Sequence, residues 1–191
     1  MKALAVAAVS SIMLLSGQAG QAAAAPPTDS LDQLVGLLAA RIGTADTVAE
    51  IKWAAAQQDS SQPVIDDPAR EATIYDAMTQ LGAQHGLPET WVRQVFAGQI
   101  DASKLVQRGL VTVWESGVAH APTPTTDLAG IRPVIDRLNT SIIDEMSDRR
   151  AELTGPGCAA RVTASVVAVG ARQPDDLHQA ALIQAAVPLC D

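Results

Sequence analysis

The sequence predicts an all-α, single-domain fold: a bundle of about six helices with a disulfide-tied helical pair at its C-terminal end. Composition is the first reason. Apolar residues make up 48% of the 191 residues and aromatic residues only 3%, which favours helices over sheets. Periodicity is the second reason, because apolar residues recur at intervals of three and four and no segment alternates as a strand would.

Residues 1–25 are set apart from this fold because they have the pattern of a cleavable signal peptide. Lys2 supplies a basic start, Ala3 to Leu15 form an apolar segment, and the run GQAAAAPP offers small-residue cleavage sites. The apolar segment is too short for a comfortable transmembrane span, and a retained N-terminal anchor is the alternative. We therefore expect a periplasmic or secreted protein whose mature domain, residues 26–191, does not associate with a membrane.

The mature domain is acidic. The chain has a net charge of −8, which becomes −9 once Lys2, the only charged residue of the signal segment, is removed. A net acidic chain without a basic run argues against nucleic acid as a partner and against binding to anionic membrane surfaces. Any cationic site must therefore be local.

The first predicted helix begins near Thr28 or Asp29, either of which can cap it, and runs to about Gln58. Arg41 and Lys52 are eleven residues apart, close to three helical turns, so both cations lie on one face of this otherwise apolar helix. Because a buried unpaired charge is costly, the pair indicates an anion between helices, and the alternative is two side chains snorkelling at the rim of the core. The apolar stripe of this helix consists of Leu31, Leu34, Leu38, Ile42, Ala45 and Ala49.

The second helix follows a polar segment that contains two prolines. Asp66 or Asp67 can cap it, and Pro68 occupies its first position, where a missing backbone N–H is tolerated. The helix is predicted to run to about His85, where Gly86 ends it.

The third helix is predicted from Pro88 to about Ser116, and the fourth from about Asp127 to Leu153. A polar break rich in Pro and Thr separates them. These four helices form the expected core of the domain, residues 29–153.

Residues 154–191 form a predicted C-terminal extension, with two shorter helices at about 158–172 and 175–189. Its two cysteines, Cys158 and Cys190, are the only cysteines of the chain. In an exported protein such a pair indicates one disulfide, which would contribute about 3 to 4 kcal/mol in the chain-entropy model.

Two further polar groups share helix faces. Asp67, Arg70 and Glu71 are spaced i, i+3 and i+4, and Ser103 and Gln107 are spaced i and i+4. The first group is also consistent with a helix cap and a solvated charged face, and the second with exposed polar positions.

Arg132 has apolar neighbours in the fourth predicted helix, although a surface arginine near a helix start would look the same.

In combination, R-x10-K, D-x-x-R-E and S-x-x-x-Q on successive helices are similar to the pattern of all-helical chorismate mutases. The segment LAGIRPVIDRLN, which contains Arg132, and the C-terminal cysteine pair resemble the exported gamma subclass. The resemblance covers nearly all of the mature chain.

This resemblance implies isomerisation of chorismate to prephenate by a pericyclic Claisen rearrangement, for which we expect no metal or cofactor. The reaction needs a dianionic substrate held in a compact geometry and donors directed at its ether oxygen. The resemblance assigns the ether oxygen to Lys52 and Gln107 as catalytic donors. It assigns the two carboxylates to Arg41 and Arg132, whose guanidinium groups can bind both oxygens of a carboxylate.

The remaining carried-over roles are supporting ones. Arg70 is expected to support the substrate. Glu71 is expected to accept a hydrogen bond from the substrate hydroxyl, and Asp67 lies beside Glu71 in this role. Ser103 is expected to contact a substrate carboxylate or the region of the hydroxyl. Because Arg132 belongs to the same chain, one protomer can supply every group, which leaves a homodimer open.

Two alternatives remain at this stage. One is an isochorismate-pyruvate lyase of the same fold, which also needs cations and a donor to an ether oxygen. The other is a non-catalytic exported helical protein that binds an anion or a protein partner.

Overall fold

The computed structural model describes residues 30–190, and every regular secondary-structure element within them is a helix, as predicted. The predicted signal peptide, residues 1–25, and the expected cap residues Thr28 and Asp29 lie outside the described residues. No helix in this part of the chain combines the length and apolar character needed to span a bilayer. The elements are α1 (Asp32–Asp59), α2 (Pro68–Gln84), α3 (Glu89–Glu115), α4 (Leu128–Asp148), α5 (Arg150–Thr154), α6 (Cys158–Gly170), α7 (Asp176–Ala186) and the 3-10 helix η1 (Val187–Leu189).

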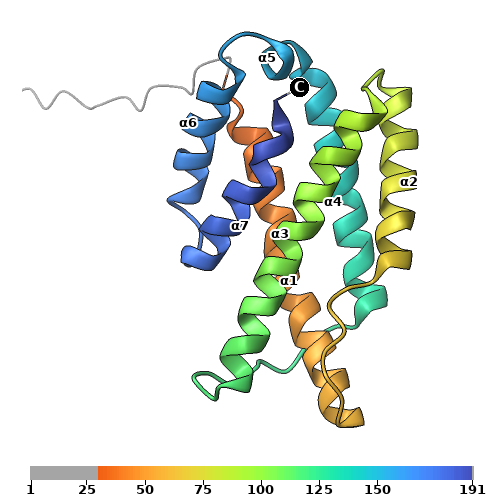
Figure 1. Cartoon of the computed structure of the whole chain (residues 1–191), viewed down its shortest axis with the longest axis vertical. Coiled ribbons are helices and arrows are strands. Elements are labelled where there is room, and N and C mark those ends of the chain that lie inside the picture. The colour runs from red at the N-terminus through yellow and green to blue at the C-terminus, as the bar shows by residue number, and fades with distance from the viewer. Residues whose placement is uncertain (1–29, 191) are drawn as a thin grey trace, which may run out of the picture.

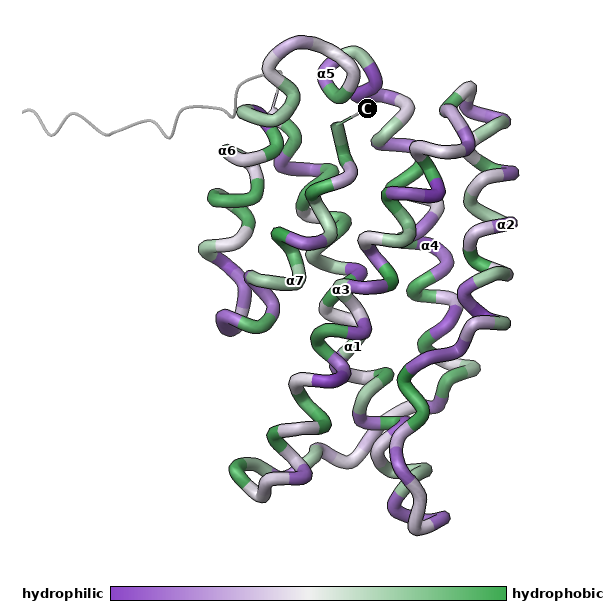
Figure 2. Tube along the Cα trace, in the orientation of Figure 1, coloured by the Kyte–Doolittle hydropathy of each residue, from purple (hydrophilic) through white to green (hydrophobic). Residues whose placement is uncertain are grey.

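Helices α1 and α3 form the centre of the bundle (Figure 1). α1 packs against α3, α4, α6 and α7, while α3 also packs against α2 and α7. α2 and α4 contact each other on one flank, and α6 and α7 lie on the opposite flank. Figure 2 shows hydrophobic and hydrophilic residues interspersed along each long helix, which is typical of helices that bury one face.

The core lies where α1, α3, α4 and α7 meet. The apolar stripe predicted for the first helix is confirmed, because all six of its residues are buried. Burying one large apolar side chain contributes about 1.5–3 kcal/mol, so this contact region provides most of the stabilisation. Its large buried side chains include Leu34, Leu38, Ile42, Trp91, Phe96, Ile142, Met146 and Leu182.

Local capping chemistry explains the bounds of α2. The Asp67 carboxylate accepts a hydrogen bond from the backbone N–H of Arg70 at 3.0 Å, and Pro68 is the first helical residue, as predicted. Gly86, with a φ of +70°, follows the helix in the left-handed conformation that glycine adopts readily. The start of α1 differs from the prediction, because Leu31 is its N-cap and makes no side-chain cap bond.

The predicted fourth helix is in fact two helices. α4 ends at Asp148, and a kink at Arg149, with φ −101° and ψ 17°, separates it from α5. The backbone N–H of Arg149 still bonds the carbonyl of Glu145 at 2.9 Å, so the kink bends the chain without unwinding it. The bend brings Leu153 into the core, where it is fully buried. Packing at the end of the bundle, rather than local propensity, therefore sets this boundary.

The C-terminal helical pair is fixed to the bundle at two points. The disulfide between Cys158 and Cys190, predicted from the cysteine count, joins the first residue of α6 to the residue after η1. The Trp91 indole N–H on α3 donates to the carbonyl of Pro188 in η1 at 3.1 Å. These contacts hold α6 and α7 against the central helices.

A buried histidine links α7 to α1. His178 is 3% exposed, with its Nδ1 2.7 Å from the Asp175 carboxylate and its Nε2 3.0 Å from the Asp46 carboxylate of α1. Both contacts are hydrogen bonds when both ring nitrogens carry a proton. Burial alone would lower the pKa of His178, but the hydrogen bonds and charges of Asp175 and Asp46 outweigh burial and raise it.

We expect His178→Asn to lower the free energy of unfolding more near pH 6 than near pH 9. A raised folded-state pKa contributes stability that is complete below the unfolded value of about 6.5 and is lost as pH rises through the folded pKa. Urea unfolding at the two pH values measures this difference. His120→Asn, at an exposed loop position, is the matched control and should show no such dependence. An equal loss at both pH values for His178→Asn would contradict a charged link.

Candidate functional site

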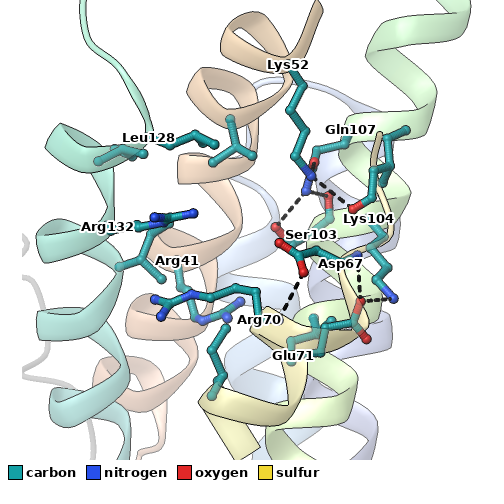
Figure 3. A pocket seen from close by; sticks show the side chains of 16 residues that line it. Arg41, Lys52, Asp67, Arg70, Glu71, Ser103, Lys104, Gln107, Leu128 and Arg132 are labelled. Atoms are coloured by element: carbon teal, nitrogen blue, oxygen red, sulfur yellow. Dashed lines mark hydrogen bonds and ion pairs between the residues drawn. The ribbon is translucent and has the colours of Figure 1, made fainter. Parts of the chain in front are cut away.

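A cavity of about 130 Å³ lies between α1, α3 and the N-terminal ends of α2 and α4 (Figure 3). Every polar residue that the sequence singled out for a site lines it, although they come from four separate segments of the chain. Helix periodicity explains part of this convergence, since residues on one face of a helix meet the same neighbour. The eight residues are Arg41, Lys52, Asp67, Arg70, Glu71, Ser103, Gln107 and Arg132.

Arg41 is a buried cation held only by neutral groups. Its side chain lies in the core with the residue 4% exposed. Its Nε donates to the Asn139 side-chain oxygen at 2.6 Å, and its Nη1 donates to the backbone carbonyl of Gln99 at 3.1 Å. Burial, together with the nearby positive charge of Arg70, lowers the pKa of Arg41 to about 10, so it stays charged at neutral pH.

Lys52 is held from two sides. Its Nζ donates to the backbone carbonyl of Ile65 at 2.9 Å and to the Gln107 side-chain oxygen at 3.0 Å. An ammonium group has three N–H donors, so one remains for a ligand in the cavity. Burial lowers the pKa of Lys52, and the negative charges of Asp67 and Asp66 partly oppose this.

Gln107 points its amide into the same cavity. The residue is 5% exposed, and its oxygen accepts from Lys52 while its nitrogen donates to the backbone carbonyl of Ser103 at 3.2 Å. The Ser103 hydroxyl lies 3.4 Å from the same nitrogen. The contact with the lysine fixes which end of the amide is the oxygen, and the two contacts of the amide nitrogen, both with Ser103, are long.

The start of α2 combines a helix cap with two charged groups. The Asp67 carboxylate caps the helix, and the backbone N–H of Asp67 donates to the Glu71 carboxylate at 3.3 Å. Arg70 forms an ion pair with Asp136 of α4 at 3.1 Å, with side chains 31% and 58% exposed. Ion pairs this exposed are weak, so Arg70 can exchange Asp136 for a ligand carboxylate.

Arg132 enters the cavity from α4. It is exposed, and within residues 30–190 it makes no hydrogen bond or ion pair. Around it the cavity wall is apolar, and an apolar wall lowers the local dielectric and strengthens contacts with a charged ligand. The apolar lining residues are Val48, Ile65, Ile74, Ile100, Leu128, Ile131 and Ile135.

One cation that lines the cavity was not predicted from the sequence. Lys104, with a side chain 14% exposed, bridges the Glu71 carboxylate at 2.7 Å and the Asp66 carboxylate at 3.1 Å. Burial alone would lower the pKa of Lys104, but these two carboxylates outweigh it and raise the pKa. Arg108 also bonds Asp66, at 2.8 Å. Together they attach the α1–α2 connection, residues 60–67, to α3, and with it the Ile65 carbonyl.

A signal for Lys104 was present, because it precedes Gln107 by three residues and so shares its helix face. Asn139 carried no comparable signal, since its contact with Arg41 depends on how α4 approaches α1.

The cavity is locally positive in an acidic protein. Besides Lys104, which is paired, four cations line it, whereas the carboxylates that line it are those of Asp67 and Glu71. Arg41 and Arg132 form no ion pair within the described residues. This arrangement suits a small ligand that carries more than one negative charge.

Comparison with known proteins identifies the family. Residues 28–108 match the family chorismate mutase type II. A secreted chorismate mutase of Mycolicibacterium smegmatis is 33% identical over 177 residues, which span 92% of this chain and 94% of that protein. The chain belongs to the secreted chorismate mutase family.

Further comparisons agree. A secreted chorismate mutase of Mycobacterium tuberculosis is 32% identical over 173 residues, or 88% of this chain and 82% of that protein. The crystal structure of a chorismate mutase from Burkholderia phymatum superposes with a TM-score of 0.77 at 33% identity, covering 85% of this chain and 97% of that one. The family match to residues 28–108 ends before Arg132 and the disulfide, but these comparisons with secreted chorismate mutases span most of the chain.

We expect Lys104→Met to speed amide hydrogen exchange in residues 60–67, because the bridge to Asp66 and Glu71 attaches this segment to α3 and α2. Arg108→Met is the matched control. It removes the two hydrogen bonds of Arg108 to Asp66 but leaves the bridge of Lys104 to both carboxylates in place, so its effect should be smaller. Wild-type exchange rates in Lys104→Met would show that the bridge does not hold the segment.

Proposed function

We propose that this protein is a chorismate mutase that converts chorismate to prephenate outside the cytoplasm. The observation that supports it most is one cavity in which the Lys52–Gln107 donor pair stands with two arginines, Arg41 and Arg132, that form no ion pair. Membership of the family agrees with this reaction. The names of the secreted relatives and the predicted signal peptide agree with the location.

The rearrangement places two demands on the site. The ether C–O bond of chorismate breaks while a C–C bond forms, in one cyclic redistribution of electron pairs without proton transfer. The site must therefore hold a dianion in the geometry in which the two reacting carbons meet. In our proposal Arg41 and Arg132 each bind one carboxylate, and the apolar wall keeps water away.

The second demand is electrostatic. Negative charge develops on the ether oxygen as its bond breaks, and donors already fixed in place stabilise that charge without reorganising. In our proposal the third N–H of Lys52 binds this oxygen, together with an amide N–H of Gln107 that exchanges its 3.4 Å contact with the Ser103 hydroxyl for it. Their contacts with each other, with Ile65 and with Ser103 fix their positions before substrate arrives.

The α2 residues complete the proposed site. Glu71, held by Lys104, accepts from the substrate hydroxyl, and Arg70 exchanges Asp136 for a substrate carboxylate. Asp67 acts through the helix cap that positions Arg70 and Glu71.

The proposal needs only one protomer. Every proposed group comes from a single chain, so catalysis does not require a second copy, and a homodimer stays open.

We expect the purified protein to convert chorismate to prephenate and Lys52→Ala to lower kcat at least about a hundred-fold, since it removes a contact that strengthens in the transition state. Arg132→Ala should mainly raise KM. Arg137→Ala, at an exposed position on α4, is the control. Pyruvate and salicylate formed from isochorismate, without prephenate from chorismate, would instead indicate the lyase. No turnover of either substrate would indicate a binding protein.

We expect kcat to be flat between about pH 6 and pH 8, because the amide of Gln107 donates at any pH. At alkaline pH kcat should fall, and the fall should begin below the ordinary lysine range because burial lowers the pKa of Lys52. Gln107→Glu is the matched variant. Its carboxyl donates only when protonated, so its kcat should rise as pH falls. A steep loss of wild-type kcat between pH 6 and 8 without unfolding would contradict the assignment.

A further inference from the structure

The strongest contact of Arg41 is made with an uncharged residue. Its Nε lies 2.6 Å from the side-chain oxygen of Asn139 on α4, and the two residues are 4% and 1% exposed. Its second acceptor, the Gln99 carbonyl, is also neutral. This guanidinium is therefore fixed in orientation while its full positive charge stays without a counter-ion.

Two other cations of the cavity have carboxylate partners. Arg70 is paired with Asp136, and Lys104 with Glu71 and Asp66. A buried charge is where an ion pair would relieve the largest penalty, because removal from water is costly. An aspartate at position 139 would have nearly the shape of asparagine and would supply that pair. The most buried cation of the cavity is thus left without an ion pair.

We infer that Asn139 is a positioning residue that holds Arg41 in place without neutralising it, so that the charge remains available to a carboxylate of the ligand. This inference rests on the proposed function, in which Arg41 binds the substrate. Arg41 has five N–H donors, of which Asn139 and Gln99 engage two, and Arg41 lines the cavity. The substrate dianion is then the counter-ion that the empty protein lacks.

The inference predicts opposite effects on stability and on substrate binding. Asn139→Asp supplies Arg41 with an internal counter-ion, which should leave the melting temperature unchanged or raise it. The same carboxylate neutralises the binding charge and repels the incoming dianion. KM for chorismate should therefore rise at least about ten-fold, since a charge-assisted hydrogen bond is lost, while kcat falls less. A residue that served packing alone would lose stability and binding together.

Three variants and two readouts test this. Asn139→Asp, Asn139→Ala and Thr140→Asp are compared by steady-state kinetics with chorismate and by the rise in melting temperature that added chorismate produces. Asn139→Ala removes the anchor but keeps the charge, so its KM should rise about five-fold, less than in Asn139→Asp. Thr140→Asp is the control for charge on α4, because it adds a negative charge at an exposed position that does not line the cavity, and it should leave KM near the wild-type value.

Each outcome decides something different. A folded Asn139→Asp with KM and chorismate-induced stabilisation within two-fold of wild type would overturn the inference. If Asn139→Asp does not fold, Asn139→Ala with a wild-type KM would overturn it. If the wild type is stabilised by chorismate but does not turn it over, the proposed function fails. The thermal shifts of wild type and Asn139→Asp then still test the role of Asn139.

Discussion

The arrangement of the site depends on a positive charge buried between helices. The guanidinium of Arg41 joins α1 to α4 through Asn139 and α1 to α3 through the Gln99 carbonyl. Lys52 repeats this further along α1, with Gln107 on α3 as its partner. The polar contacts that hold the central helices in register are therefore the same contacts that orient the cations. Neither cation has an anionic partner in hydrogen-bond contact, so the empty protein keeps an electrostatic penalty that an anionic ligand removes.

That penalty must be offset elsewhere, and the opposite flank of the bundle contributes to this in addition to the apolar core. There α6 and α7 pack on α1 and α3, and the contacts differ in kind from those of the cavity. Cys158 and Cys190 are covalently joined, Trp91 bonds the η1 backbone, and His178 is held between two carboxylates. His178 on this flank is paired with carboxylates, whereas Arg41 and Lys52 on the other flank are not, a division expected where binding and stability make opposing demands.

Much of this could be predicted from sequence, for reasons that differ by residue. The bounds of α2 followed from local chemistry, because Asp67 caps and Gly86 terminates a helix within a few residues of chain. The kink at Arg149 could not be predicted, since it depends on packing at the end of the bundle. Helix periodicity predicts which polar residues share a helix face, and eight residues chosen in this way line one cavity. Periodicity does not predict which helices contact each other. Lys104 and Asn139 were missed because their partners lie on other elements, whereas the roles of the eight rest on family resemblance.

The disulfide gives the protein a dependence on its surroundings. A bond between Cys158 and Cys190 forms and persists in oxidising compartments and is reduced in the cytoplasm. A chain that has not been exported would therefore lack the covalent closure of α6 and α7 over the central helices. The same polypeptide would thus be a more weakly constrained protein on one side of the membrane than on the other, so its stability is set partly by where it resides.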